Sequence, residues 1–525
     1  MNFVESLQIF FVNIGGMLIS PSILLILFGS VIMGIIFGAT PGLTATLGVA
    51  LLTTLTYGMD ASTAMVALMG IYVGGVYGGS YTSILVNIPG TAASAATALD
   101  GYPLACKGQA GRALGLTTTS SAIGTFIGMI FVVALAPVIS ALALQFTSFE
   151  FFLLALFGIV ISGTLTSHDL VYKGWIAGFI GLFLSTIGRD SLQFFPRFTF
   201  GMSDLEGGLD LVPVLIGAFG IPQIMTSIRD NFKVGETHKF KRIVPDFKTI
   251  AGNTPSILRS SLIGVGIGAV PGIGEDIAGW VSYGAAKRAS KHPEEFGNGA
   301  VDAVISTETA NNSCIGGAMI PLLTLGVPGS PPAAMLLGAL LLHGIQPGPM
   351  LTIDHPTFIL EITAILLLAS VAMWVCGILL AKQVIKVLKI PTSIFMPVIA
   401  VLCVIGSYAL GMRVFNLYLM LPLGILAYLM SEMKYPIAPL IIGVILGNMC
   451  DANLRRALMV SKGSFEPVFT RPVSLVLFLI IVLMIVGQIP YFQNLQRKLT
   501  SRLSFLRKSE IEGNAEATAD CQDHE

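Results

Sequence analysis

The chain alternates long apolar runs with short polar interruptions, and two interruptions have the same form. At 87–93 (Asn-Ile-Pro-Gly-Thr-Ala-Ala) and at 326–332 (Gly-Val-Pro-Gly-Ser-Pro-Pro), a Pro-Gly pair among small residues breaks an apolar run. At membrane depth, unwound backbone is tolerated only where it is buried in protein or lines a wet cavity. Matched breaks in two halves of a chain are the best sequence-level indication of a transporter binding site.

Apolar runs approaching the roughly 20 residues that cross a bilayer recur along the chain. They predict about 12 membrane segments, several of which are too short to span alone. The runs are 23–37, 43–57, 63–86, 114–141, 151–165, 174–185 and 211–224, and then 257–283, 300–342, 358–381, 394–410, 417–430, 437–449 and 473–489.

The two halves repeat short motifs in the same order. Gly-Ala-Thr-Pro-Gly-Leu at 38–43 corresponds to Gly-Ala-Val-Pro-Gly-Ile at 268–273, the break at 89–90 to the break at 328–329, and Val-Pro-Val-Leu-Ile-Gly at 212–217 to Ala-Pro-Leu-Ile-Ile-Gly at 438–443. A weaker pair joins 149–152 to 393–396. Motifs in register predict an internal repeat.

Loop charges indicate that the repeats are inverted. Loops 57–62, 141–150 and 342–351 contain no Lys or Arg, whereas their counterparts in the other half contain several. Because cytoplasmic loops collect Lys and Arg, this opposition predicts inverted topology, although the pairing of Lys173 with Arg413 and of Arg229 with Arg455 and Arg456 breaks the pattern. The basic residues that carry the comparison are Lys107, Arg112, Lys287, Arg288, Lys291, Lys382, Lys386 and Lys389.

These patterns predict an all-α polytopic membrane protein with two inverted repeats, re-entrant hairpins and broken helices. The expected parts are a first membrane repeat at 1–228, a cytoplasmic linker at 229–250, a second repeat at 251–470, an extra transmembrane helix at 471–492, and a cytoplasmic, partly disordered tail at 493–525. The N-terminus lacks the positive segment of a signal peptide, so we expect the first apolar stretch to be retained.

Composition supports the membrane class and narrows the function. The chain is 54% hydrophobic and 11% charged, whereas soluble domains carry roughly 25% charged residues. Its 29 basic and 29 acidic residues give no signal for a nucleic-acid partner. It has no HExxH and no GxxxxGK[ST] motif, and Gly-Glu-Asp at 274–276 is not an aspartyl-protease motif, so we expect no enzyme. Scattered cysteines predict no metal centre, and no cofactor is expected.

Two kinds of break have predicted roles. Segments 22–57 and 257–283 are two short arms around a Pro-Gly tip and predict re-entrant hairpins. After the other breaks a helix restarts with Thr91 or Ser330 at its N-cap, where free N–H groups and the positive dipole end suit a carboxylate. Unwound carbonyl groups can coordinate Na⁺.

The candidate residues come from these breaks and from polar positions near them. Polar groups inside a membrane face a cavity or a partner, although small and amide residues also pack helices closely. Glu275 and Asp276 are candidates for either ion binding or an interfacial position, and His343 and His355 suit a solvated external loop. The predicted substrate-binding residues are Thr40, Pro41, Gly42, Ser80, Thr82, Ser83, Asn87, Pro89, Gly90, Thr91, Asn311, Asn312, Ser313, Pro328, Gly329 and Ser330. The predicted ion-binding residues are Pro271, Gly272, Glu275, Asp276, Glu308 and Gly326.

Longer motifs resemble a known family. Residues 38–43, 77–90 (beginning Tyr-Gly-Gly-Ser-Tyr-Thr-Ser) and 101–104, with 271–274, 308–312 (Glu-Thr-Ala-Asn-Asn) and 324–330, resemble the large membrane subunit of tripartite tricarboxylate transporters, the TctA family. The resemblance covers nearly the whole chain up to the C-terminal tail. It implies secondary uptake of tri- or dicarboxylates driven by a Na⁺ or H⁺ gradient. It also implies a small TctB-like membrane subunit, a periplasmic TctC-like binding protein, and the bacterial inner membrane. The alternative is a non-transporting assembly or sensor subunit.

Overall fold

The computed structural model describes residues 3–167, 170–230, 243, 246–388, 392–409 and 412–488. Contacts divide the chain into two units, residues 1–457 and residues 458–525. The predicted linker lies mostly outside the described residues, and the predicted tail lies entirely outside them. The predicted domain boundaries therefore stay predictions.

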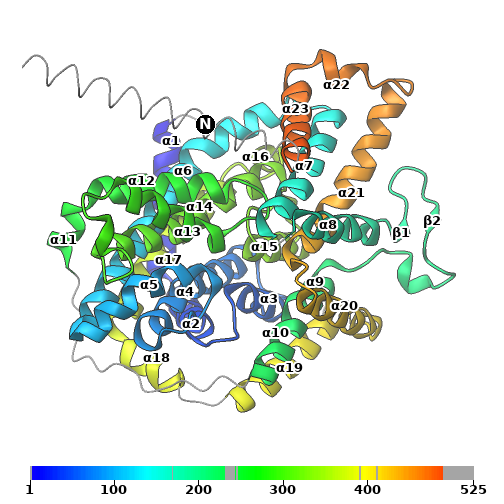
Figure 1. Ribbon diagram of the computed structural model, residues 1–525. Helices are drawn as coiled ribbons and strands as arrows, with labels where there is room; N and C mark the ends of the chain where they lie inside the picture. The colour runs from blue at the N-terminus through cyan, green and yellow to red at the C-terminus, as the bar shows by residue number, and fades with distance from the viewer. Residues whose placement is uncertain are drawn as a thin grey trace, which may run out of the picture. The chain divides into compact units, whose positions relative to one another are not determined.

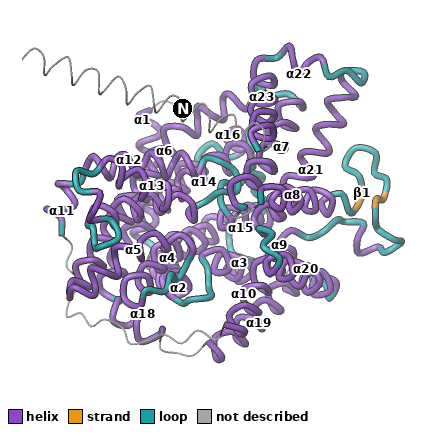
Figure 2. The backbone as a smooth tube through the Cα atoms, in the orientation of Figure 1, coloured by secondary structure: helices purple, strands orange, loops and turns teal. Residues whose placement is uncertain are grey.

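Helices make up most of the described chain (Figures 1 and 2). The described strands are β1 (Gly188–Arg189) and β2 (Pro196–Arg197), which form one antiparallel pair. The helices up to residue 230 are α1 (Phe3–Ile19), α2 (Pro21–Ala39), α3 (Ala45–Leu55), α4 (Ala61–Val86), η1 (Ala92–Ser94), α5 (Ala95–Leu104), η2 (Ala105–Gln109), α6 (Ala110–Ala143), α7 (Ser148–Thr166), α8 (Val171–Ser185), η3 (Ser203–Leu205), α9 (Leu211–Leu215), η4 (Ile216–Gly220) and α10 (Ile221–Asp230).

The later helices continue the pattern of long apolar helices joined by short ones. They are α11 (Phe247–Gly252), α12 (Thr254–Gly268), α13 (Glu275–Ala289), η5 (Pro293–Glu295), α14 (Val301–Leu325), α15 (Pro331–Leu342), α16 (Leu351–Asp354), α17 (Phe358–Leu379), α18 (Ala381–Leu388), α19 (Thr392–Ala409), α20 (Phe415–Glu432) and α21 (Ile437–Val460). The second unit contains α22 (Glu466–Thr470) and α23 (Pro472–Gly487).

Many of these helices have the length and composition of membrane spans. Among the described residues, eight helices are long and apolar enough to cross a bilayer, and there are six shorter apolar helices. The predicted all-α polytopic class is confirmed, and the chain is a multi-pass membrane protein. Helix α1 is absent from the predicted spans because Glu5, Gln8 and Asn13 interrupt its apolar run.

Both predicted hairpins with Pro-Gly tips are present, and their re-entrance stays a prediction. In the turn between α2 and α3, Gly42 has a φ of +90°, and in the turn between α12 and α13, Gly272 has a φ of +74°. Left-handed backbone of this kind favours glycine, which accounts for the Pro-Gly tips. One expectation was wrong: α2 is not a short arm, because it runs for 19 residues from Pro21 to Ala39 and is long enough to cross a bilayer, whereas α3 has 11 residues.

Both predicted helix breaks are also present. Helix α4 ends at Val86 and is followed by Asn87 with a left-handed φ of 58°, and α14 ends at Leu325 and is followed by Gly326 with a φ of 71°. The chain becomes helical again after Thr91 and after Ser330. Asn and Gly are the residues that adopt this conformation most readily, so the sequence sets both helix ends locally.

The two hairpins pack in the same way on the two long broken helices. Gly38 of α2 lies so close to α4 that an added Cβ would overlap the carbonyl oxygen of Gly75. Gly268 of α12 lies equally close to α14, at the carbonyl oxygen of Cys314. Figure 1 shows α2 beside α4 in blue and α12 and α13 beside α14 in green. This matching packing supports the internal repeat independently of the sequence motifs.

Helices α4 and α14 are central and largely buried. Helix α4 contacts α2, α3 and α17, and α14 contacts α6, α12 and α13. From residue 64 to residue 85 in α4, and from residue 303 to residue 324 in α14, every side chain is buried. Their polar residues therefore face protein and not lipid.

Candidate functional site

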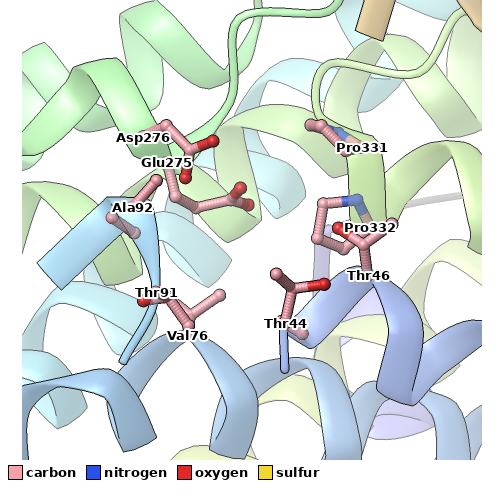
Figure 3. Close-up of a pocket in the computed structure, with 11 residues that line it drawn as sticks. Thr44, Thr46, Val76, Thr91, Ala92, Glu275, Asp276, Pro331 and Pro332 are labelled. Carbon is pink, nitrogen blue, oxygen red and sulfur yellow. The ribbon is translucent and has the colours of Figure 1, made fainter. Parts of the chain in front are cut away.

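Four helix starts converge on one small cavity (Figure 3). These starts belong to α3, to η1, to α13 and to α15, so each repeat contributes one hairpin and one broken helix. The cavity has a volume of about 70 Å³. It is lined by Thr44, Ala45, Thr46, Val76, Thr91, Ala92, Ala93, Glu275, Asp276, Pro331 and Pro332.

The helix starts differ in the hydrogen-bond donors that they leave free. The Thr44 hydroxyl accepts a 3.2 Å hydrogen bond from the backbone N–H of Leu47. The Ser330 hydroxyl accepts a 3.3 Å bond from the N–H of Ala333, and the prolines at 331 and 332 have no N–H. The expectation of free N–H groups at Ser330 was therefore wrong. Helix α15 presents its positive dipole end but no free donor in its first three residues.

A buried carboxylate connects the two repeats beside the cavity. Glu275, at the start of α13, has 3% of its surface exposed and accepts a hydrogen bond from the hydroxyl of Tyr72 on α4. The same Tyr72 hydroxyl lies 2.8 Å from the hydroxyl of Ser330. Tyr72 thus joins the acidic group of one helix start to the N-cap of another.

The η1 turn of the first repeat is held by two residues of the second. The carboxylate of Asp276, which is exposed, accepts a hydrogen bond from the backbone N–H of Ala93. Asn311 on α14 donates a 2.6 Å bond from Nδ2 to the carbonyl oxygen of Ala93. Asn311 Oδ1 is buried without a hydrogen-bond partner. An added Cβ at Gly279 would lie 2.8 Å from it, so glycine there makes room for the amide.

A second buried carboxylate lies outside the cavity. Glu308 on α14 has none of its surface exposed. Its Oε1 accepts hydrogen bonds from Ser80 at 2.7 Å and from Thr97 at 2.5 Å, and its Oε2 accepts one from Ser121 at 2.8 Å. Three hydroxyl groups from α4, α5 and α6 therefore surround one acidic side chain.

Several other predicted residues hold the scaffold in place. The Thr40 hydroxyl donates to the carbonyl of Ile36 in its own helix, and Ser313 donates to the carbonyl of Ser261 on α12. Asn312 donates to the carbonyl of Glu308 in its own helix. The predicted residues that do not line the cavity are Thr40, Pro41, Gly42, Ser80, Thr82, Ser83, Asn87, Pro89, Gly90, Asn311, Asn312, Ser313, Pro328, Gly329, Ser330, Pro271, Gly272, Glu308 and Gly326.

Sequence reasoning missed Thr44, Thr46 and Tyr72. Thr44 and Thr46 directly follow a predicted tip, and that position could have identified them. Tyr72 lies within a long apolar run and contacts residues more than 200 positions away, so no local signal marks it.

An ion network fixes the β1–β2 loop to α21. Arg455 bonds to both carboxylate oxygens of Asp190, with 2.8 Å from Nη2 to Oδ1, and Arg197 Nη1 lies 3.0 Å from Asp451 Oδ2. The bonds from Arg455, together with backbone N–H groups at 192 and 193, hold the pKa of Asp190 well below its ordinary value. Among the described residues, no group of three or more His, Cys, Asp or Glu side chains could hold a metal ion.

Comparison with known proteins identifies the family. The chain matches the tripartite tricarboxylate transporter TctA family over residues 24–442. It is 35% identical to an "uncharacterized 52.8 kDa protein in TAR-I ttuC' 3'region" of Agrobacterium vitis, over 85% of this chain and 89% of that protein. An "uncharacterized protein in TAR-II ttuC' 3'region" from the same organism is 35% identical over 40% of this chain and 86% of its own length. No solved structure matches the chain. With matched hairpins, matched helix breaks and a family match that spans most of its length, the chain belongs to the TctA family of tripartite tricarboxylate transporters, a transporter family and not an enzyme family.

Proposed function

We propose that this chain is the translocating subunit of a secondary transporter that imports tri- or dicarboxylates, and that the cavity between the four helix starts binds one carboxylate group. The convergence of these starts carries the proposal, because helix N-termini attract anions. The hydroxyl groups of Thr44, Thr46 and Thr91 can donate hydrogen bonds to a carboxylate there.

The size of the cavity bears on how a substrate fits. A volume of about 70 Å³ corresponds to about two water molecules in the liquid, whereas pockets for whole small molecules are roughly 300 Å³ or more. One carboxylate group fits this volume. The rest of a tricarboxylate needs the cavity to widen, which is consistent with a transport cycle that changes the separation of the helix starts.

The charges of the cavity favour a coupling cation. Glu275 and Asp276 line the same space that a substrate carboxylate would enter, and like charges at short range repel. A cation, Na⁺ or H⁺, that binds with the substrate offsets this repulsion. Because coupling between two ligands is reciprocal, each would raise the affinity for the other.

The family also suggests partners and a location. Tripartite transporters combine this subunit with a small TctB-like membrane protein and a TctC-like binding protein that delivers the substrate. We place the complex in the bacterial inner membrane, with the binding protein on the periplasmic side. The alternative function, a non-transporting assembly or sensor subunit, does not need a polar cavity between two repeats.

Uptake by the reconstituted complex tests the proposal. Proteoliposomes containing this chain, its small membrane partner and its binding protein are given labelled citrate and a panel of dicarboxylates, with and without a Na⁺ or pH gradient. We expect uptake that requires both the binding protein and one gradient. Binding of the partners without uptake of any compound on the panel would favour the assembly or sensor function.

A matched pair of variants locates the site. Thr91→Val removes a cavity hydroxyl, and we expect the half-saturating substrate concentration to rise about 10-fold, the effect of one hydrogen bond to a charged group. Thr40→Val is the control, because the Thr40 hydroxyl is equally buried but bonds to its own helix. Equal effects of the two variants would contradict the assignment of the cavity.

A further inference from the structure

Glu308 is a carboxylate deep in the protein without a cationic partner. Its side chain is fully buried, and among the described residues no Lys, Arg or His side chain forms an ion pair with it. Burial disfavours the charged form of a carboxyl group unless hydrogen bonds or a cation compensate. The compensation here comes from the hydroxyl groups of Ser80, Thr97 and Ser121.

The distances to these hydroxyls fit a proton-binding site. Each hydroxyl oxygen lies 2.5–2.8 Å from a carboxylate oxygen, which is the range of a direct O–H···O hydrogen bond. A proton can be exchanged within these direct hydrogen bonds without any rearrangement of the surrounding oxygens.

The hydroxyl of Thr97 has two possible acceptors. It lies 2.5 Å from Glu308 Oε1 and 3.1 Å from the hydroxyl oxygen of Thr307. Thr307 in turn donates its own hydrogen to the carbonyl oxygen of Ala303, at 3.0 Å. When Glu308 is ionised, Thr97 donates to it. When Glu308 is protonated, its O–H can donate to Thr97, whose hydrogen turns to Thr307. Both charge states keep their hydrogen bonds without movement of heavy atoms.

We propose that Glu308 binds and releases a proton within the Ser80, Thr97 and Ser121 cage, and that this site, which rests on the proposed transport function, supplies a coupling proton separate from the cation that Glu275 and Asp276 attract to the cavity. In the binding step, a proton from water forms the O–H bond at Oε1. In the release step, that bond breaks and the proton returns to water. No other reactant is required.

One short segment connects this site to the cavity. Residues 91–97 begin with Thr91, which lines the cavity, and end with Thr97, which bonds to Glu308. Between them, Ser94 bonds to Ser83 on α4. A substrate that moves the helix start at Thr91 therefore also changes the hydrogen bond at Thr97. Through this segment, substrate binding changes the affinity of Glu308 for its proton, as coupled transport requires.

Among the described residues, the hydrogen-bond partners of the Glu308 carboxylate are all hydroxyl groups of Ser80, Thr97 and Ser121, and none is a titratable side chain. Asp100 on α5 is occupied by the backbone N–H groups of Gly297, Gly299 and Ala300 and by the hydroxyl of Tyr283. The titratable groups on the elements packed against α14 are Tyr72, Tyr77 and Tyr81 of α4, Asp100 and Tyr102 of α5, Arg112 of α6, Arg259 of α12, Glu275, Asp276, Tyr283, Lys287 and Arg288 of α13, Asp302 and Cys314 of α14 itself, and Asp354 of α16.

Infrared difference spectroscopy of the purified full chain tests the site without any substrate. A protonated carboxylic acid has a carbonyl stretch that is separate from the bands of a carboxylate. We expect wild-type protein to gain this band as pH falls from about 9 to about 5, a range that buried glutamates can reach, and Glu308→Gln to lose the component that Glu308 contributes. Glu150→Gln is the matched control, because Glu150 is also buried but caps its own helix, and this variant should keep the band. Identical spectra for wild type and Glu308→Gln would overturn the proposal.

A second variant keeps the test valid if Glu308→Gln does not fold. Thr307→Val removes the alternative acceptor for the Thr97 hydrogen while conserving shape. We expect the midpoint of the band's titration to move down by about one pH unit, the effect of one hydrogen bond. An unchanged midpoint would contradict the proton site.

Transport assays separate this proposal from the proposed function on which it rests. In proteoliposomes, Glu308→Gln should lose uptake driven by a pH gradient but keep exchange of labelled for unlabelled substrate. If the band titrates but no carboxylate is taken up, the transport proposal fails and the proton site stands. If uptake is normal in Glu308→Gln, the proton site fails and transport stands.

Discussion

The contact between Asn311 and Ala93 makes a sharp prediction, because a neighbouring residue provides the control. Asn311→Ala removes the 2.6 Å hydrogen bond by which α14 holds the η1 turn. Asn312→Ala removes an amide of the same size from the next position, where the side chain donates within its own helix and accepts a 3.5 Å bond from Thr125 on α6, without contact to the η1 turn. Both residues are buried, at 1% and 0% exposure, so the two variants leave similar cavities.

The structure sets the size of the effect. Loss of a buried hydrogen bond costs about 1 to about 2 kcal/mol, which shifts a local equilibrium about 5-fold to about 30-fold. The bond joins the two repeats at the η1 turn. We therefore expect its loss to make residues 91–104 open more frequently. The backbone N–H of Ala93, which donates a hydrogen bond to Asp276, belongs to this segment.

Hydrogen–deuterium exchange measured by mass spectrometry on the detergent-solubilised chain reads this opening directly. We expect peptides within 91–104 to exchange about 5-fold to about 30-fold faster in Asn311→Ala than in wild type, and to be nearly unchanged in Asn312→Ala. The reasoning is refuted if both variants accelerate this segment equally, since a general loss of packing would then explain the result.

Two further predictions concern the scaffold. Gly329→Ala should sharply lower the amount of folded protein, because the new Cβ would overlap the backbone of α12. Gly266→Ala should not, because there is open space around Gly266. Comparable yields of the two variants, measured by fluorescence-detected size exclusion, would contradict the packing. The lowered pKa of Asp190 means that its ion pairs stabilise the β1–β2 loop above the unfolded pKa of about 4 and are lost only as pH falls through the lower folded value. The protection factors of residues 188–197, which compare their amide exchange with the intrinsic rate at each pH, should therefore stay constant from neutral pH down to about 4 and fall below it. Arg455→Gln should lower them already at neutral pH, and a fall in wild type near pH 6 would show that another group controls the loop.

The sequence allowed prediction of features that local chemistry determines. The breaks at 87–90 and 326–329 and the tips at 41–42 and 271–272 were predictable because Pro ends helices and Gly accepts left-handed backbone. The membrane class followed from the apolar runs. The missing donors at the start of α15 could also have been noted, since the prolines at 331 and 332 are visible in the sequence.

Long-range packing determines the features that were not predictable. Thr97 and Ser121 are ordinary hydroxyl residues in helices, and their importance depends on Glu308, more than 180 positions away. Tyr72 appears as one aromatic residue in an apolar helix until α13 and α15 are placed beside it. Which hydroxyls face a common carboxylate depends on how the two repeats interlock, and one sequence does not encode that in any local pattern.

The glycine contacts of α2 with α4 and of α12 with α14 restrict how this chain can evolve. Backbone meets backbone there, so no side-chain rotamer lies between the helices to absorb a replacement. A larger residue at Gly38 or Gly268 would separate the helices along their length. Lipid-facing positions can drift among Leu, Ile, Val and Phe with little cost, while these narrow stripes tolerate almost no increase in volume. Each hairpin and its long helix therefore form one unit that tolerates few substitutions, whereas the lipid-facing positions around it tolerate many.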